Sequence, residues 1–148
     1  MKAFLPTAKH IVGFILTFVF FVIIGIIVST QFNLAEISSL GLVISLTTRL
    51  NTTLSDIVGM APLFGTIFGA GLLIATIVGG QIVRWLPRLR TQIYITASFV
   101  SVIVTLLAMK SVFSITAIAA TRSADGFIAL CLVGAVAGYV FAKTSRQR

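Results

Sequence analysis

The sequence predicts an all-α integral membrane protein: a four-transmembrane-helix bundle with an amphipathic outer-face segment between the first and second helices. Hydrophobic residues make up 58% of the 148 residues and charged residues only 9%. The mean hydropathy of +1.15 also lies far outside the range of soluble domains. Four apolar runs are each close to the roughly 20 residues that cross a bilayer. We expect a single membrane domain over residues 1–148.

The first predicted span covers residues 11–28. It contains no charged side chain and follows the basic residues Lys9 and His10. Its apolar core is longer than that of a secretory signal peptide, and no A-x-A cleavage site follows it. We therefore expect this segment to remain in the protein as a transmembrane helix.

The second predicted span covers residues 62–83. Ser55 and Asp56 are suited to cap the turn before it, and Pro62 is tolerated in the first turn of a helix. The sequence therefore predicts a helix that begins close to Pro62.

The third and fourth predicted spans cover residues 93–113 and 124–142. The only charged residue of the third, Lys110, lies near enough to its end to reach the headgroups. At the start of the fourth, Ser123 is a candidate N-cap, and Asp125 lies at the positive end of the helix dipole. These features predict helix ends at the membrane surface.

The distribution of Lys and Arg predicts the orientation, because cytoplasmic segments carry an excess of both. If both termini are cytoplasmic, eight of the 11 basic residues lie inside: Lys2, Lys9, Arg84, Arg88, Arg90, Lys143, Arg146 and Arg148. The outer segments then carry Arg49, Lys110 and Arg122. The net charge of +8 is thus expected to face anionic lipid headgroups at the cytoplasmic surface, and not nucleic acid.

The long outer segment between the first two spans has a helical period. One stripe is polar and contains Ser38, Ser45, Arg49, Thr52 and Asp56; the opposite face carries Leu40, Val43, Leu50 and Leu54. This pattern predicts an amphipathic helix that lies in the outer interface or roofs the bundle. A broken or partly extended loop is the alternative, because Gly41 and several threonines weaken the helical pattern.

Small residues at helical spacing predict close helix packing in the second and fourth spans. The pairs are Gly65 with Gly69 and Gly134 with Gly138. Glycine at i and i+4 lets helices approach closely in lipid, where close contact drives association. We expect these two helices to pack against each other, either within one chain or between copies.

Two polar features are candidate sites. Tyr94, Ser98, Ser101 and Thr105 place four hydroxyls on one face of the third span, either as a polar path or as hydrogen bonds between and within helices. Arg122 and Asp125 form a candidate polar site at the outer rim. They are either a solvated helix start or, if residues 114–123 re-enter the membrane, a paired and partly desolvated unit.

The residues that most enzymes need are missing from the predicted spans. The sequence has one cysteine, Cys131, one histidine, and no carboxylate within a span except Asp125 at the very start of the fourth. Metal clusters, thiol–histidine pairs and paired carboxylates therefore lack their groups. We expect no enzymatic activity, no cofactor and no metal.

The plan is similar in size and hydropathy to many small multi-pass proteins of the bacterial inner membrane, a resemblance that assigns no residue roles. Our first hypothesis is a non-enzymatic accessory or scaffolding subunit that associates with itself or with a membrane partner. The alternative is a small oligomeric channel or transporter with a hydroxyl-lined path along the third helix. A third hypothesis is lipid or hydrophobic-molecule binding beneath the outer segment.

Overall fold

The computed structural model describes residues 8–41, 43–113 and 123–145, and within these ranges the chain is helical, with no strand. The α-helices are α1 (Ala8–Ser39), α2 (Leu46–Trp85), α3 (Arg90–Phe113) and α4 (Ala124–Thr144). A short 3-10 helix, η1 (Pro87–Leu89), leads into α3. All four α-helices are long and apolar enough to cross a membrane. The prediction of an all-α chain with four membrane-length helices is confirmed.

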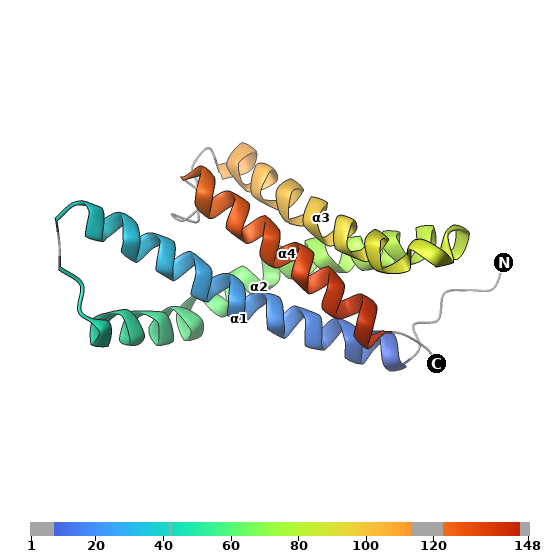
Figure 1. The fold of residues 1–148 in the computed structure, drawn as a ribbon, viewed down its shortest axis with the longest axis horizontal. Helices are drawn as coiled ribbons and strands as arrows, with labels where there is room; N and C mark the ends of the chain where they lie inside the picture. The colour runs from blue at the N-terminus through green and yellow to red at the C-terminus, as the bar shows by residue number, and fades with distance from the viewer. Residues whose placement is uncertain (1–7, 42, 114–122, 146–148) are drawn as a thin grey trace.

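The four helices form a ring in which each one packs against two others. Figure 1 shows the four helices. Both α1 and α3 pack against α2 and α4, whereas the described residues of the diagonal pairs, α1 with α3 and α2 with α4, do not pack against each other. Three phenylalanines fill the centre of the α1–α2 contact. The ring centroids of Phe64 and Phe68 lie 4.5 Å apart, and that of Phe21 lies 5.3 Å from Phe68.

The first helix is longer than the predicted span, continuing past residue 28 to Ser39. After its last turn comes Gly41, with a φ of +89° that side chains disfavour and glycine readily adopts. The Gly41 amide donates to the Ser38 carbonyl oxygen at 3.1 Å, so one of the carbonyl groups at the end of α1 is satisfied. The helix therefore ends at a glycine turn and not at the start of the polar residues.

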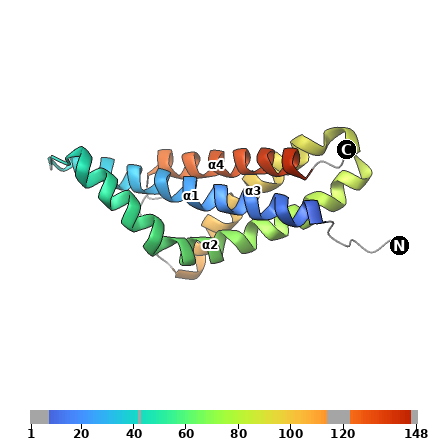
Figure 2. The same cartoon turned by 90° about the horizontal axis from the view of Figure 1, so that it is seen from below.

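The second helix begins well before the predicted residue 62. Its N-cap is Ser45, whose hydroxyl accepts a hydrogen bond from the Thr48 amide at 3.2 Å. The expected cap at Ser55 and Asp56 is wrong, because both residues lie inside α2. Pro62 also lies inside this helix, and α2 changes direction between its two halves (Figure 2), as a proline without an amide hydrogen allows.

The shorter helices agree with the predicted spans to within three residues. α2 ends at Trp85, because Leu86 precedes Pro87 and the residue before a proline avoids the helical region. α3 has 24 residues and α4 has 21. At about 1.5 Å per residue, each is just long enough for a hydrocarbon core of about 30 Å.

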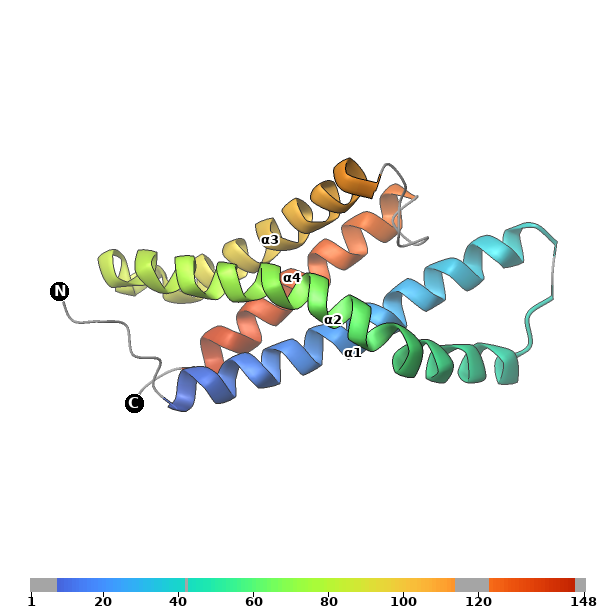
Figure 3. The ribbon, with the colours of Figure 1, turned by 180° about the vertical axis from the view of Figure 1, so that it is seen from behind.

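The extra length of α1 and α2 projects from one end of the bundle. We call this part the outer hairpin; its described residues are 29–41 and 43–61. It extends beyond the start of α4 and the end of α3 (Figure 3). We call the opposite end, with the start of α1 and the end of α4, the inner end. The outer segment is therefore not a roof over the bundle but a continuation of two of its helices.

Contacts between α3 and α4 fix the inner end. The Arg90 guanidinium donates to the Ser145 hydroxyl at 2.7 Å, and its Cζ lies 5.7 Å from the centroid of the Tyr94 ring. That ring meets Phe141 edge-on, with centroids 4.8 Å apart. A cation, a hydroxyl and two aromatic rings thus hold the start of α3 against the end of α4.

Candidate functional site

Hydrogen bonds join α1 and α2 across the outer hairpin. The Thr30 hydroxyl donates to the Asp56 carboxylate at 2.7 Å, and the Gln31 amide donates to the Thr53 hydroxyl at 3.2 Å. The Arg49 guanidinium donates to the side-chain oxygen Oε1 of Gln31 at 3.3 Å. We call these five side chains the polar seam. The seam holds Arg49 and Asp56, the charged residues of the first half of α2, on its half-buried side.

Two polar atoms of α1 near this seam have no hydrogen-bond partner among the described residues. They are the Ser29 hydroxyl oxygen and the carbonyl oxygen of the Asn33 side chain. Ser29 is only 2% exposed. A buried polar atom without a partner costs about 1–3 kcal/mol, so this part of α1 is not optimised for stability alone.

Large apolar side chains of the outer hairpin point outward. We call four of them, spaced every four residues along α2, the apolar stripe; their exposed fractions are 80% for Leu46, 66% for Leu50, 63% for Leu54 and 80% for Val58. The predicted amphipathic helix is interrupted, because Leu40 and Val43 lie between α1 and α2, whereas Leu50 and Leu54 lie on α2. Within α2 the charged residues are turned toward α1 and the apolar residues are uncovered. A hairpin surrounded by water would adopt the reverse arrangement.

The outer hairpin extends past the start of α4 (Figure 1). At that start the Ser123 hydroxyl accepts a hydrogen bond from the Gly126 amide at 3.2 Å, and Asp125 in the first turn is exposed. In a membrane a carboxylate is favourable among headgroups and water and costly in the hydrocarbon core.

Each pair of predicted packing glycines meets a different helix. A Cβ atom added at Gly65 or Gly69 would lie 3.1 or 2.7 Å from the Phe18 ring of α1. At Gly134 it would lie 2.6 Å from a methyl group of Val102, and at Gly138 against the backbone of α3. The expectation that α2 and α4 pack against each other is wrong within one chain, because they are a diagonal pair in the ring. Both glycine pairs instead face neighbours in the same chain.

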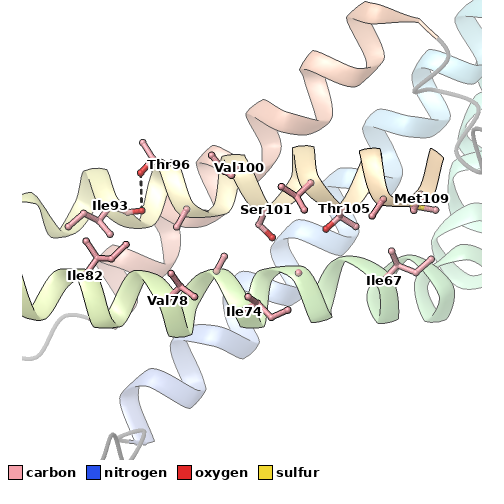
Figure 4. A pocket seen from close by; sticks show the side chains of 15 residues that line it. Ile67, Ile74, Val78, Ile82, Ile93, Thr96, Val100, Ser101, Thr105 and Met109 are labelled. Carbon is pink, nitrogen blue, oxygen red and sulfur yellow. Dashed lines mark hydrogen bonds between the residues drawn. The ribbon is translucent and has the colours of Figure 1, made fainter. Parts of the chain in front are cut away.

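The four hydroxyls of α3 do not share one environment. Tyr94 and Ser98 are 3% and 1% exposed and lie inside the bundle. Ser101 and Thr105 line a groove of about 800 Å³ between α2 and α3, whose other lining residues are mostly aliphatic (Figure 4). Gly71 forms part of the groove beside them; a Cβ atom there would be 2.6 Å from the Thr105 hydroxyl. Within one chain the hydroxyls therefore form two separate pairs.

The predicted rim site is described only in part. Asp125 is exposed in the first turn of α4, beside the Ser123 cap. Arg122 and residues 114–121, which bear on the question of a re-entrant segment, lie outside the described residues.

Metal-binding clusters and known relatives give no further indication of function. Among the described residues, no group of three or more His, Cys, Asp or Glu side chains is placed to hold a metal ion. Comparison with protein-family models, curated proteins and solved structures finds no match to this chain.

Sequence reasoning found the polar residues of the outer hairpin but not their partners. The sequence places Arg49 and Asp56 on one polar stripe, and Thr53 lies on the same side of α2. The predicted first span ends at residue 28, whereas α1 continues to Ser39 and brings Thr30 and Gln31 opposite these residues.

Proposed function

We propose that this chain is a non-enzymatic accessory or scaffolding subunit of a bacterial inner membrane, with both termini in the cytoplasm. It associates with a membrane protein, either a second copy or a different chain, through the apolar stripe of the outer hairpin. The exposure of this stripe beyond the start of α4 is the observation on which the proposal rests.

The polar seam supports this assignment. Hydrogen bonds between side chains of α1 and α2 fix the hairpin from within, so the apolar residues are not needed for its internal packing. Four large side chains that are each more than 60% exposed form the kind of contiguous apolar surface that marks an interaction site. A partner with an apolar face would cover them and remove them from water.

Site-specific photo-cross-linking in native membranes tests the proposal. A photoreactive residue in place of Leu54 should give a discrete protein adduct, whose mass distinguishes a second copy from another chain. The matched control is Leu63, which is 65% exposed on the same helix but lies past Pro62, beside the bilayer core. We expect lipid adducts only at this position.

Two outcomes would contradict the proposal. One is an identical set of lipid adducts at positions 54 and 63, because the stripe would then lie in the bilayer interface. The other is a protein adduct at position 54 that persists at equal yield when Leu50 is replaced by serine. A contact that depends on the stripe should weaken when its central side chain becomes polar.

The groove between α2 and α3 is the observation that favours the alternative function, a channel or transporter. Ser101 and Thr105 open onto it, so copies that met along this groove would bring four or more hydroxyls to a shared boundary. The replacement of both residues by valine should then abolish solute flux in proteoliposomes. Absence of flux in the parent protein, or unchanged flux in the double valine variant, would contradict this alternative.

A further inference from the structure

A small polar pocket lies at the inner end, between the start of α3 and the end of α4. Its volume is about 310 Å³. Three cations line it, Arg88, Arg90 and Lys143, together with the Thr91 hydroxyl and the Tyr139 ring. None of its lining residues is acidic. The pocket therefore concentrates positive charge in a small volume.

Neutral groups, and not carboxylates, position two of the three cations. Arg90 donates to the Ser145 hydroxyl at 2.7 Å, and that hydroxyl in turn donates to the Phe141 carbonyl oxygen at 2.6 Å. The Lys143 ammonium lies 5.8 Å from the centroid of the Tyr139 ring. These contacts orient the cations without neutralising them.

The acidic residues of the sequence are far from this pocket. Glu36 and Asp56 lie in the outer hairpin, and Asp125 lies in the first turn of α4, whereas Lys143 lies in the last. No acidic side chain of the described chain therefore offsets the charge of the pocket. The start of α3 adds a partial positive charge and the end of α4 a partial negative one, so the net charge of the pocket comes from its three cations.

We infer that this pocket binds a phosphate group, and that the phosphate belongs to the headgroup of an anionic phospholipid. Guanidinium groups match phosphate oxygens with paired donors, and ammonium and hydroxyl groups complete the set. Basic pockets at helix ends on the cytoplasmic side are typical sites for such headgroups. The inference is independent of the partner proposed for the outer hairpin.

The surface next to the pocket favours a lipid over a soluble phosphate compound. Tyr139, Val136 and Leu132 follow one another along one face of α4, and their exposed fractions are 46%, 49% and 55%. An acyl chain can extend along this face while the headgroup occupies the pocket. Trp85, which is 88% exposed, lies at the same end, where tryptophan is enriched at the membrane interface.

Lipid binding to the purified full-length protein tests the inference. The protein in a neutral detergent is titrated with phosphatidylglycerol or phosphatidylcholine, and bound lipid is counted by native mass spectrometry. We expect a preference for phosphatidylglycerol. Arg88→Gln and Lys143→Gln should each weaken its binding about tenfold, the loss of one charge-assisted contact, and together they should abolish the preference. Arg90 is left intact because it also holds Ser145.

The control is Arg84→Gln, which removes a cation from the same end without altering the pocket. If this variant weakens phosphatidylglycerol binding as much as Arg88→Gln does, general surface charge explains the preference and the inference fails. It also fails if the parent binds both lipids equally and inorganic phosphate does not bind. Binding of inorganic phosphate at millimolar concentration, without a preference for phosphatidylglycerol over phosphatidylcholine, would support a phosphate site but overturn its assignment to a lipid.

Discussion

The replacement of glycines by alanine, one at a time, should give a graded series of stabilities set by what each new methyl group meets. At Gly138 the added Cβ would lie against the backbone of α3, 2.9 Å from the Cα atom of Ile95. At Gly65 its nearest neighbour is the end of the Phe18 ring, 3.1 Å away. At Gly59 nothing lies within 4 Å. The three sites share a helical backbone and differ mainly in their surroundings.

The expected free energies follow from two opposing effects. Alanine stabilises a helix interior by about 0.5–1 kcal/mol relative to glycine, so Gly59→Ala should stabilise the protein by that amount. At Gly138, α3 must move by more than about half an ångström, because the Tyr94 carbonyl group lies even closer to the added Cβ than the Ile95 Cα atom does. Overpacking of this kind costs about 1–3 kcal/mol, which leaves a net loss of up to about 2.5 kcal/mol. Gly65→Ala should fall between them, because a ring end can shift more easily than a backbone.

Equilibrium unfolding in mixed micelles of a mild detergent and SDS measures this series, with far-ultraviolet circular dichroism and Trp85 fluorescence as independent signals. The order of stability should be Gly59→Ala, then Gly65→Ala, then Gly138→Ala. If Gly138→Ala is as stable as Gly59→Ala, the close contact of α4 with α3 does not exist. The ring arrangement of the four helices would then be wrong.

Three further predictions concern the outer end and the topology. Thr30→Val removes the hydroxyl that donates to Asp56 and should lower the free energy of unfolding by about 1.5–3 kcal/mol; an unchanged value would mean that the seam is open in the membrane. Ser123→Ala should cost about 0.5–2 kcal/mol through the lost cap, whereas Asp125→Asn should cost less than 0.5 kcal/mol because its side chain is exposed; the reverse order would indicate a buried rim site. With the native cysteine replaced, Arg88→Cys should resist a membrane-impermeant thiol reagent in intact cells, and labelling from outside would refute the predicted orientation.

The number and approximate positions of the helices could be predicted because a hydrocarbon core imposes one length on every span. The helix ends in the outer hairpin could not be predicted in this way. Hydropathy reports where a helix contacts lipid, and α1 remains helical after its residues become polar. Thr30 and Gln31 were interpreted as a loop, but hydrogen bonds to α2 hold them in the helix. Pro62 was similarly taken as a first-turn residue, although membrane helices tolerate an internal proline.

The packing surfaces were predictable, but the partner of each surface was not. Two glycines spaced four residues apart indicate that another helix packs closely there. Any helix with a suitable side chain can occupy the space beside the two glycines. The second helix receives Phe18 at Gly65 and Gly69, whereas the fourth receives Val102 at Gly134. This choice depends on the ring order of the helices, which no local spacing encodes. The basic pocket was missed for the same reason, since its cations come from two segments that meet only in the folded chain.

The outer hairpin has the same arrangement of side chains as the rest of the bundle, with polar groups between the helices and apolar groups outside. In lipid, helices associate through small and polar side chains and expose apolar ones. The hairpin keeps that arrangement past the exposed Asp125 at the start of α4, the level that we propose lies among headgroups and water. Water alone would favour a repacking that turns Leu50 and Leu54 inward. Because the polar seam occupies the inside, the proposed protein partner would cover the apolar stripe from outside without bending the hairpin toward the bilayer.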